Sequence, residues 1–226
     1  MKTFSIAIDG PSGAGKSTMA KTIAKNLGII YLDTGALYRT VGLHVFRKGA
    51  DPSSADEVVP LLSEIEIGVY PGGGGQKMTL NGEDVTTEIR KHEISHYASA
   101  VSAIPEVRAF LLDLQRDFAV KNSVIMDGRD IGTVVLPKAD VKIFLTATPE
   151  DRARRRYLEL SKAGQDVNYE TVLRDIVERD KCDSTRAAAP LKAADDAVTI
   201  DTSGLSISES VALLTKVIGE RLNVVL

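Results

Sequence analysis

Two short stretches of the sequence contain residues whose types and spacing suit chemistry. Residues 92–96 read HEISH, and on a helix this spacing puts two imidazoles on one face, as a catalytic zinc site requires. Residues 10–18 read GPSGAGKST, which satisfies the pattern G-x-x-x-x-G-K-[ST] of a phosphate-binding loop. The two stretches predict different reactions, so the elements around them must decide which one the chain supports.

The glycine-rich stretch has the residue types that bind a triphosphate. Glycines let the backbone curve around phosphate without Cβ clashes, and successive amides point inward as an anion nest. We expect Lys16 to reach the β- and γ-phosphates and the Ser17 hydroxyl to bind Mg²⁺. The residues predicted to bind ATP here are Gly10, Pro11, Ser12, Gly13, Ala14, Gly15, Lys16, Ser17 and Thr18. The alternative is a glycine-rich turn with a chance lysine.

Strand-like and helix-like segments alternate along the chain. An apolar run at 3–8 precedes the loop and predicts a buried strand, and a helical pattern at 16–27, closed by Gly28, follows it. Further strands are predicted at 29–32, 123–126, 141–146 and 197–201, and further helices at 36–47 and from Thr148 and Ser206 onward. This alternation predicts an α/β fold, in which helices cover both faces of a mostly parallel sheet.

Residues 65–87 break the alternation. They contain two runs of alternating polarity separated by four glycines at 72–75, and then Asn81-Gly82, a strong signal for a two-residue hairpin turn. We therefore expect a small antiparallel β insertion within the α/β frame.

The phosphate-binding loop does not identify the enzyme, because GTPases, motors and small-molecule kinases share it. The sequence has no N-K-x-D motif for guanine, and its D-x-x-G match at 201–204 lies near the C-terminus, where a switch segment is not expected. It also has no apolar strand that ends in Asp-Glu, as a motor ATPase would need. These features favour phosphoryl transfer to a small acceptor.

Composition narrows the class further. With 28 Lys and Arg against 31 Asp and Glu, the net charge of −3 argues against a protein that binds nucleic acid polymers. Cys182 is the only cysteine, so an internal disulfide and a cysteine-based zinc cluster are excluded. The N-terminal apolar run is too short for a signal-peptide core, and no stretch approaches the ~18 apolar residues of a membrane span. We expect a cytoplasmic protein without membrane partners.

Clusters of charged residues occur at 33–39 (DTGALYR), 127–132 (DGRDIG) and 179–186 (RDKCDSTR). The first two follow apolar strands, so they lie on the side of the sheet where the phosphate-binding loop also lies. In the third, Arg179 and Asp183 are four residues apart and share a helix face. Each cluster also has a purely structural interpretation: a capped helix, a turn, and a helical ion pair worth ~0.3 kcal/mol.

The motifs GPSGAGKST, DTGALYR, DGRDIGTVV and RDKCDSTRAAAPL, in this order and spacing, resemble the bacterial cytidylate kinases. These are P-loop nucleoside monophosphate kinases, which transfer the γ-phosphate of ATP to CMP or dCMP. The resemblance runs nearly end to end over residues 1–226. It implies a three-layer P-loop kinase domain with its core at about 1–64 and 104–226, an acceptor-site β insertion at about 65–103 and a helical lid at about 152–170. It also implies a monomer that uses ATP and Mg²⁺.

The resemblance implies roles for the matching positions. The residues implied for CMP binding are Ser12, Thr34, Arg39, Ser99, Arg108, Arg129, Asp130, Arg179 and Asp183, and those implied for catalysis are Lys16, Arg129 and Arg186. Ser17 is the implied metal ligand. In the arginine run at 151–160, Arg152 and Arg156 are expected to point together at the ATP phosphates when the lid closes. The choice among these two and Arg155 stays open, and a solvated helix face is the alternative.

Base recognition follows from hydrogen-bond chemistry. Cytosine has an N4 amino donor beside N3 and O2 acceptors, so Asp130 is suited to accept from N4 and Arg108 to donate to N3 or O2. Uracil instead turns an O4 acceptor toward the carboxylate. The sequence leaves open the preference between CMP and dCMP and the choice of triphosphate donor.

Alternatives remain for both motifs. We expect HEISH to be a solvated helix face without zinc, since nothing marks a third ligand and the third histidine, His44, is explained by packing. UMP, AMP or an alcohol such as shikimate is an alternative acceptor. A nucleotide-dependent switch without turnover is a different class of function, and the missing guanine motif argues against it.

Overall fold

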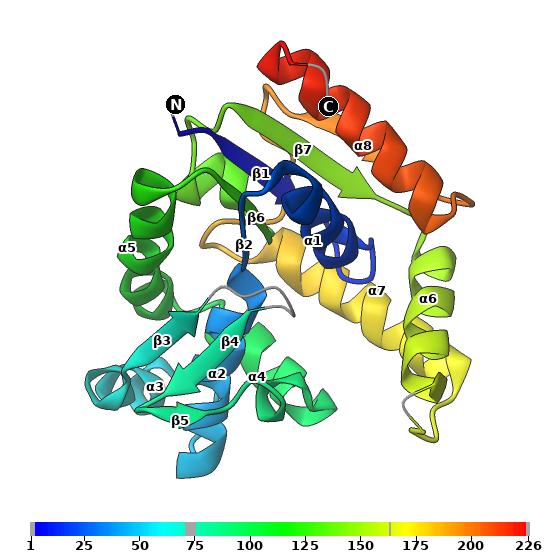
Figure 1. Ribbon diagram of the computed structural model, residues 1–226. Helices are drawn as coiled ribbons and strands as arrows, with labels where there is room; N and C mark the ends of the chain where they lie inside the picture. Colours follow the sequence, from blue (N-terminus) through cyan, green and yellow to red (C-terminus); the bar gives the residue numbers. More distant parts are fainter. Residues whose placement is uncertain (1–2, 71–75, 163, 225–226) are drawn as a thin grey trace.

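The computed structural model describes residues 3–70, 76–162 and 164–224 of the chain. At its centre lies a parallel sheet of five strands in the order β2-β6-β1-β7-β8 (Figure 1). The strands are β1 (Ser5–Asp9), β2 (Ile30–Asp33), β6 (Val124–Gly128), β7 (Val141–Thr146) and β8 (Val198–Asp201). Because all five run the same way, the loops after β1, β2 and β6 meet at one edge of the sheet.

Eight α-helices are described outside the sheet. They are α1 (Lys16–Leu27), α2 (Thr34–Lys48), α3 (Ala55–Leu61), α4 (His92–Val101), α5 (Pro105–Lys121), α6 (Pro149–Lys162), α7 (Tyr169–Thr185) and α8 (Ile207–Leu222). Short turns of helix lie at Leu62–Glu64, Glu88–Arg90 and Ile131–Val135. The predicted helix starts and stops are present: Gly28 ends α1 in the left-handed conformation, and a Ser206–Glu209 capping box opens α8.

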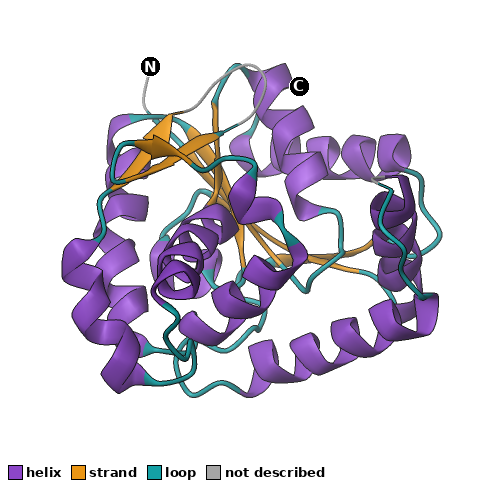
Figure 2. Ribbon diagram, turned by 90° about the horizontal axis from the view of Figure 1, so that it is seen from below, coloured by secondary structure: helices purple, strands orange, loops and turns teal. Residues whose placement is uncertain are grey.

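Helices cover both faces of the sheet (Figure 2). On one face, Ile23 of α1 and Leu214 of α8 pack in an apolar cluster with Ile143 of β7. On the other face, Phe118 of α5 packs against Met126 of β6. Neighbouring β-strand residues point to opposite faces, so the apolar runs of β1 and β6 fill both clusters. The predicted three-layer α/β architecture is confirmed.

The expected antiparallel insertion is also present. It contains β3 (Ile67–Tyr70), β4 (Lys77–Leu80) and β5 (Glu83–Asp84), paired in that order. Asn81 and Gly82 turn the chain between β4 and β5, with φ of 51° and 84°, the left-handed conformation that the Asn-Gly pair favours. The glycine run at 72–75, predicted to separate the first two strands, lies outside the described residues.

The insertion has an apolar core of its own. Leu37 and Val41 of α2 pack with Met78 of β4 and Ile94 of α4, and Val58 of α3 completes the cluster. Helix α2 begins at the sheet, where Asp33 caps it, and runs into this cluster. It therefore joins the insertion to the edge of the sheet that carries the phosphate-binding loop (Figure 1).

Helices α6 and α7 form a separate unit beside the sheet. Ala153 and Leu160 of α6 pack against Val172 and Ile176 of α7, in a small cluster distinct from the cores above. The predicted lid falls on α6 and the start of α7. Within the described ranges, no helix is both long and apolar enough to cross a membrane.

Candidate active site

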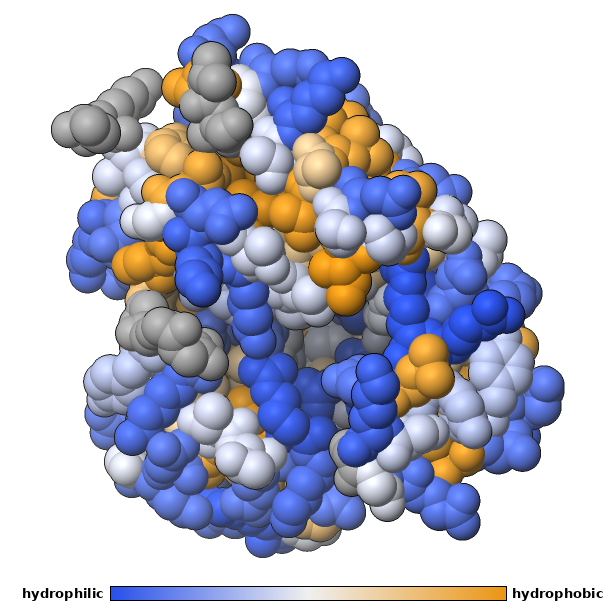
Figure 3. Space-filling model, turned by 45° about the vertical axis from the view of Figure 1, so that its right-hand side comes forward, coloured by the Kyte–Doolittle hydropathy of each residue, from blue (hydrophilic) through white to orange (hydrophobic). Residues whose placement is uncertain are grey.

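A cleft of about 1240 Å³ lies between the loop edge of the sheet, the insertion and the lid helices. Figure 3 shows this hollow with mostly hydrophilic residues around its rim. Pockets for one small ligand measure about 300–1,000 Å³, so this volume suits two ligands held together. Its lining comes from the phosphate-binding loop, the start of α2, α4, residues 127–130 and α7.

The phosphate-binding loop has the backbone that its glycines allow. Gly10 has φ of 148°, and a Cβ there would lie 1.9 Å from the carbonyl oxygen of Leu145, so only glycine fits this position. Lys16 opens α1, and its Nζ donates a 2.7 Å hydrogen bond to the Pro11 carbonyl. Burial, with the nearby Arg129, holds the pKa of Lys16 well below its usual range. The loop thus presents a buried amine and a helix N-terminus to an anion.

Asp127 stands at the centre of a second group of contacts beside the loop. The Ser17 hydroxyl donates to Oδ2 of Asp127 at 2.8 Å, and the Tyr31 hydroxyl donates to Oδ1 at 2.7 Å. Burial, and then the neighbouring Asp33, raises the pKa of Asp127. A hydroxyl and a carboxylate are the hard oxygen ligands that Mg²⁺ prefers, so these residues fit the predicted ion.

Three arginines predicted to bind CMP, Arg39, Arg129 and Arg179, face the cleft. Arg39 donates from Nη1 to Ser95 Oγ at 2.8 Å and to the Ile89 carbonyl at 3.1 Å. Burial, with Arg179 as the next cause, lowers the pKa of Arg39 to about 10. Burial, with Arg129 as the next cause, also lowers the pKa of Arg179 to about 10. Neighbouring cations thus add to the effect of burial on Arg39 and Arg179, as expected where a site is built to receive an anion.

The structure corrects one predicted pairing. The alternative interpretation of Arg179 and Asp183 was an ion pair along α7, but no such pair is found within 4.0 Å. Asp183 instead accepts from Arg129 Nε at 2.7 Å, and Arg186 Nη1 lies 3.9 Å from its other oxygen. The buried Nε of Arg179 has no hydrogen-bond partner among the described residues. Arg129 directly follows β6, so its pair with Asp183 joins the end of that strand to α7.

The two predicted base-reading residues lie together. Arg108 and Asp130 form an ion pair in which both side chains are largely buried. Arg186 Nη2 lies 3.7 Å from the second oxygen of Asp130, and the Arg108 guanidinium stacks 5.4 Å from the centroid of the Tyr38 ring. Ser99 lines the same part of the cleft from α4. An acceptor and a donor therefore sit side by side, as the Watson–Crick edge of cytosine requires.

The two remaining predicted CMP contacts lie nearer the loop. Thr34 is buried, and its hydroxyl donates to the Asp127 carbonyl at 2.8 Å. Ser12 lines the cleft, and its carbonyl accepts from Arg152 at 3.0 Å. Thr34 thus joins the start of α2 to the end of β6, and Ser12 joins the phosphate-binding loop to the lid helix α6.

The lid arginines differ from the expectation that Arg152 and Arg156 point together. Arg152 is 3% exposed; it pairs with Asp180 at 2.5 Å and donates to the Ser12 and Ala147 carbonyls at 3.0 and 2.9 Å. It does not line the cleft, because its side of α6 packs against the loop and α7. Arg156 lines the cleft and pairs with Glu159 at 2.9 Å.

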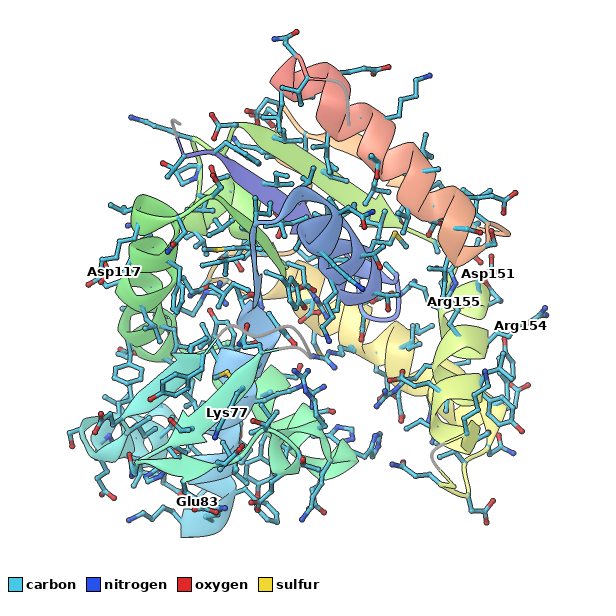
Figure 4. The ribbon with its side chains drawn as sticks, viewed as in Figure 1. Lys77, Glu83, Asp117, Asp151, Arg154 and Arg155 are labelled. Carbon is cyan, nitrogen blue, oxygen red and sulfur yellow. The ribbon has the colours of Figure 1, made fainter. Side chains whose placement is uncertain are left out.

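Arg155 lines the cleft like Arg156, but like Arg152 it also bonds a backbone carbonyl outside α6. Its Nη2 donates to the Thr202 carbonyl at 2.6 Å. Figure 4 shows Arg155 on the inner side of α6 and Arg154 pointing away from the molecule. Arg155 and Arg156 are thus the lid arginines available to a ligand in this cleft.

The HEISH stretch forms the first turns of α4. His92 and His96 are exposed, line the cleft, and have their Nε2 atoms 3.2 Å apart. Across 3–70, 76–162 and 164–224, no group of three His, Cys, Asp or Glu side chains is placed to hold a metal. His44 is buried elsewhere, with Nε2 3.6 Å from Glu64. The expected absence of zinc stays a prediction.

Comparison with known proteins decides the family. Residues 6–220 match the family model described as cytidylate kinase. The chain belongs to the cytidylate kinase family. Curated cytidylate kinases from Carboxydothermus hydrogenoformans and Caldicellulosiruptor bescii are 50% and 52% identical to it. The first alignment covers 96% of this chain and 97% of the relative, and the second covers 92% of each.

A solved structure agrees at the level of the fold. An uncharacterized protein from Eubacterium ventriosum has a TM-score of 0.54 and 14% identity, over 97% of this chain and 99% of that one. That likeness concerns the fold alone. Membership of the cytidylate kinase family confirms the resemblance seen in the sequence, and with it the prediction of an ATP-dependent enzyme that phosphorylates CMP or dCMP.

Sequence reasoning missed two residues of this cytidylate kinase site, Asp127 and Tyr31. The sequence has no apolar strand that ends in Asp-Glu, but the apolar run at 123–126 is followed by the single aspartate Asp127. That simpler pattern was the available signal for Asp127. Tyr31 had no local signal, because its partner lies 96 residues away along the chain.

Proposed function

We propose that this protein transfers the γ-phosphate of ATP to CMP or dCMP, giving ADP and CDP or dCDP for pyrimidine nucleotide metabolism. The observation that supports it most directly is the Arg108–Asp130 pair, buried in the same cleft as Lys16 of the phosphate-binding loop. Triphosphate binding at the loop and base recognition by Arg108 and Asp130 would define a donor position and an acceptor position in one cleft. The reaction between them needs alignment and charge neutralisation more than covalent chemistry.

The donor side consists of the loop and its neighbours. The amides of residues 10–18 and Lys16 bind the phosphates of ATP, and Lys16 stabilises the charge on the group in transfer. Ser17 and Asp127 would hold Mg²⁺, which neutralises phosphate oxygens when bound. Tyr31 keeps the Asp127 carboxylate in one orientation through its 2.7 Å hydrogen bond.

The acceptor phosphate is bound by Arg39 and Arg129, with support from Ser12. Arg129 already lies beside Asp183, so the arginine is oriented before the ligand arrives. Arg186, between the carboxylates of Asp130 and Asp183, reaches the phosphates during transfer. No general base is needed, since a phosphate monoester oxygen of CMP is already a nucleophile near neutral pH.

The nucleoside is read by groups deeper in the cleft. Asp130 accepts from cytosine N4, Arg108 donates to N3 or O2, and Ser99 contacts the base. The unpartnered Nε of Arg179 and the carboxylate of Asp183 bind the ribose hydroxyls. Thr34 holds the end of β6 through its bond to the Asp127 carbonyl. A uracil ring would leave its O4 against the Asp130 carboxylate, which costs about 1–3 kcal/mol.

In the closed enzyme, arginine side chains of the lid contact ATP. Arg155 and Arg156 contact the donor from α6, while Arg152 fixes α6 to Ser12 of the phosphate-binding loop and to Asp180 of α7. Closure would exclude water, which otherwise competes with CMP for the phosphoryl group. In this scheme the core at about 1–64 and 104–226, the insertion at about 65–103 and the lid at about 152–170 act as one monomeric, cytoplasmic enzyme.

An acceptor panel tests the proposal. ADP release from ATP and Mg²⁺ is measured with CMP, dCMP, UMP, AMP and shikimate as acceptors. We expect CMP and dCMP to have the highest kcat/KM. Turnover that is fastest with AMP or shikimate, or equal with and without an acceptor, would refute the assignment. Gel filtration of the purified protein tests the monomer.

A further inference from the structure

Two cleft-lining residues have no part in the scheme above, His92 and His96. They lie one turn apart on α4, which faces α7 across the cleft (Figure 1). Both side chains are exposed to solvent, and their rings meet edge to face with centroids 4.8 Å apart. The two Nε2 atoms lie 3.2 Å apart. One nitrogen of each ring therefore lies at the contact between the two rings.

This separation suits shared coordination of one cation. Metal–nitrogen bonds to imidazole measure about 2.0–2.1 Å, so nitrogens 3.2 Å apart subtend an angle of about 100° at a metal that bonds both. That angle lies between the square-planar and tetrahedral values, which span the common geometries of copper, nickel and zinc. Coordination needs no net proton loss, because an Nε2 proton can move to the exposed Nδ1 of the same ring as the tautomer changes.

The ligand chemistry of the pair favours a cation that prefers nitrogen. The cleft around the pair carries both signs of charge, with Asp175, Glu178 and Glu159 on the lid side and Arg39 and Arg156 also in the lining. Imidazole binds Zn²⁺, Cu²⁺ and Ni²⁺ well, whereas Mg²⁺ prefers oxygen ligands. The pair is thus chemically separate from the proposed magnesium site at Ser17 and Asp127.

We propose that His92 and His96 form a two-nitrogen chelate site for a borderline divalent cation such as Zn²⁺, Ni²⁺ or Cu²⁺, at the mouth of the nucleotide cleft. Water completes the coordination. This proposal departs from the expectation drawn from the sequence, which was a helix face without zinc. The site is not a hydrolase centre, because Glu93, which a zinc protease would use as its base, is exposed and does not line the cleft.

Calorimetric titration of the whole protein with ZnCl₂, in a large excess of Mg²⁺, tests the proposal. We expect the wild-type protein to bind one equivalent, and His92→Gln and His96→Gln each to weaken binding at least tenfold. Cys182→Ser is the matched control, since Cys182 is the other soft ligand exposed in this cleft and its loss should leave zinc affinity unchanged. Thermal unfolding without metal checks that all variants are folded.

A second measurement keeps the test independent of the variants. Nitrogen NMR of imidazole-labelled wild-type protein should show Zn²⁺-dependent shifts at the Nε2 atoms of two histidines, with His44 unchanged. No heat in the presence of Mg²⁺, shifts at His44 alone, or zinc affinity lost only in Cys182→Ser would each overturn the site. None of these outcomes depends on which nucleotide the enzyme phosphorylates.

Discussion

The Tyr31 hydroxyl donates to one oxygen of Asp127 at 2.7 Å while the Ser17 hydroxyl donates to the other at 2.8 Å. Tyr31 of β2 and Ser17 of α1 thus fix the two oxygens of this β6 carboxylate. Partners of this kind, one shell out from a metal, typically change metal affinity 10- to 100-fold. This relationship makes Tyr31 a positioning residue for the proposed magnesium site.

Tyr31→Phe should therefore raise the Mg²⁺ concentration needed for half-maximal turnover by about tenfold, because Asp127 loses one of its two fixed bonds. The ring itself is retained, so packing should change little. Binding of Mn²⁺ in the presence of ATP, followed by electron paramagnetic resonance, gives a readout apart from turnover. Tyr70→Phe, at an exposed residue of β3, is the control and should behave as wild type. Equal metal affinity in both variants would contradict the role of Tyr31.

Asp130→Ala should erode the preference for CMP over UMP. The substitution removes the acceptor for cytosine N4 and also the carboxylate that would face uracil O4. We expect the ratio of kcat/KM for the two acceptors to fall about tenfold or more. Asp117→Ala removes an exposed carboxylate from α5, on the outside of the molecule (Figure 4), and should leave the ratio unchanged. An unaltered ratio in Asp130→Ala would remove Asp130 from base recognition.

Arg152→Ala should destabilise the fold more than any other lid arginine substitution. It leaves Asp180 without its partner and frees the Ser12 and Ala147 carbonyls. Breaking a largely buried ion pair in this way costs about 3 kcal/mol. Arg154→Ala, at an exposed position two residues along α6 whose side chain points outward (Figure 4), should cost less than about 0.5 kcal/mol. Urea unfolding of both variants measures the difference, and equal midpoints would disprove the structural role.

Lys16→Ala should affect turnover far more than stability. The amine is buried and desolvated, so its removal relieves a cost in the folded state while deleting a donor to the phosphates. A loss of about 10²–10³ in kcat is typical when one such preorganised donor is deleted. Both kcat and the midpoint of denaturant unfolding are measured for the wild type and for Lys16→Ala. Wild-type turnover in the variant would refute the proposed mechanism.

Asp9 should make stability depend on pH. It accepts 2.7 Å bonds from the amides of Ile131 and Gly132, yet burial dominates and raises its pKa to about 6 from an unfolded value of 3.8. The folded state therefore holds the proton more tightly, and this contribution is full below pH 3.8 and lost as pH rises through 6. A shift of this size is worth roughly 3 kcal/mol.

Asp9→Asn removes that titration, so the free energy of unfolding of the wild type minus that of the variant should fall as pH rises from 4 to 7. The amide also loses one acceptor for the two backbone N–H groups, which lowers the stability of Asp9→Asn by a constant amount at every pH. Denaturant titrations at several pH values separate the two effects. Parallel stability curves for wild type and variant would show that Asp9 keeps an ordinary pKa.

The local sequence determined the secondary-structure elements of this protein and the turns between them. Glycine spacing at 10–15, caps such as Ser206 and the Asn81-Gly82 turn fix backbone conformation within a few residues, and each is present where it was predicted. Apolar periodicity likewise fixed the strands and the faces of the helices, because burial of one face depends on spacing along a single element. The alternation of elements then implied which strand ends share the cleft.

Only the tertiary structure decided which charged side chains pair with one another. Asp183 has its nearest ion pair with Arg129, 54 residues away, and Ser17 bonds Asp127 across 110 residues. Arg152 and Arg156 share a spacing that predicts one common direction, yet only Arg156 faces the cleft. Long side chains can reach several partners at similar cost, so the choice depends on how helices pack against the sheet. That packing is a property of the whole chain, which no single motif contains.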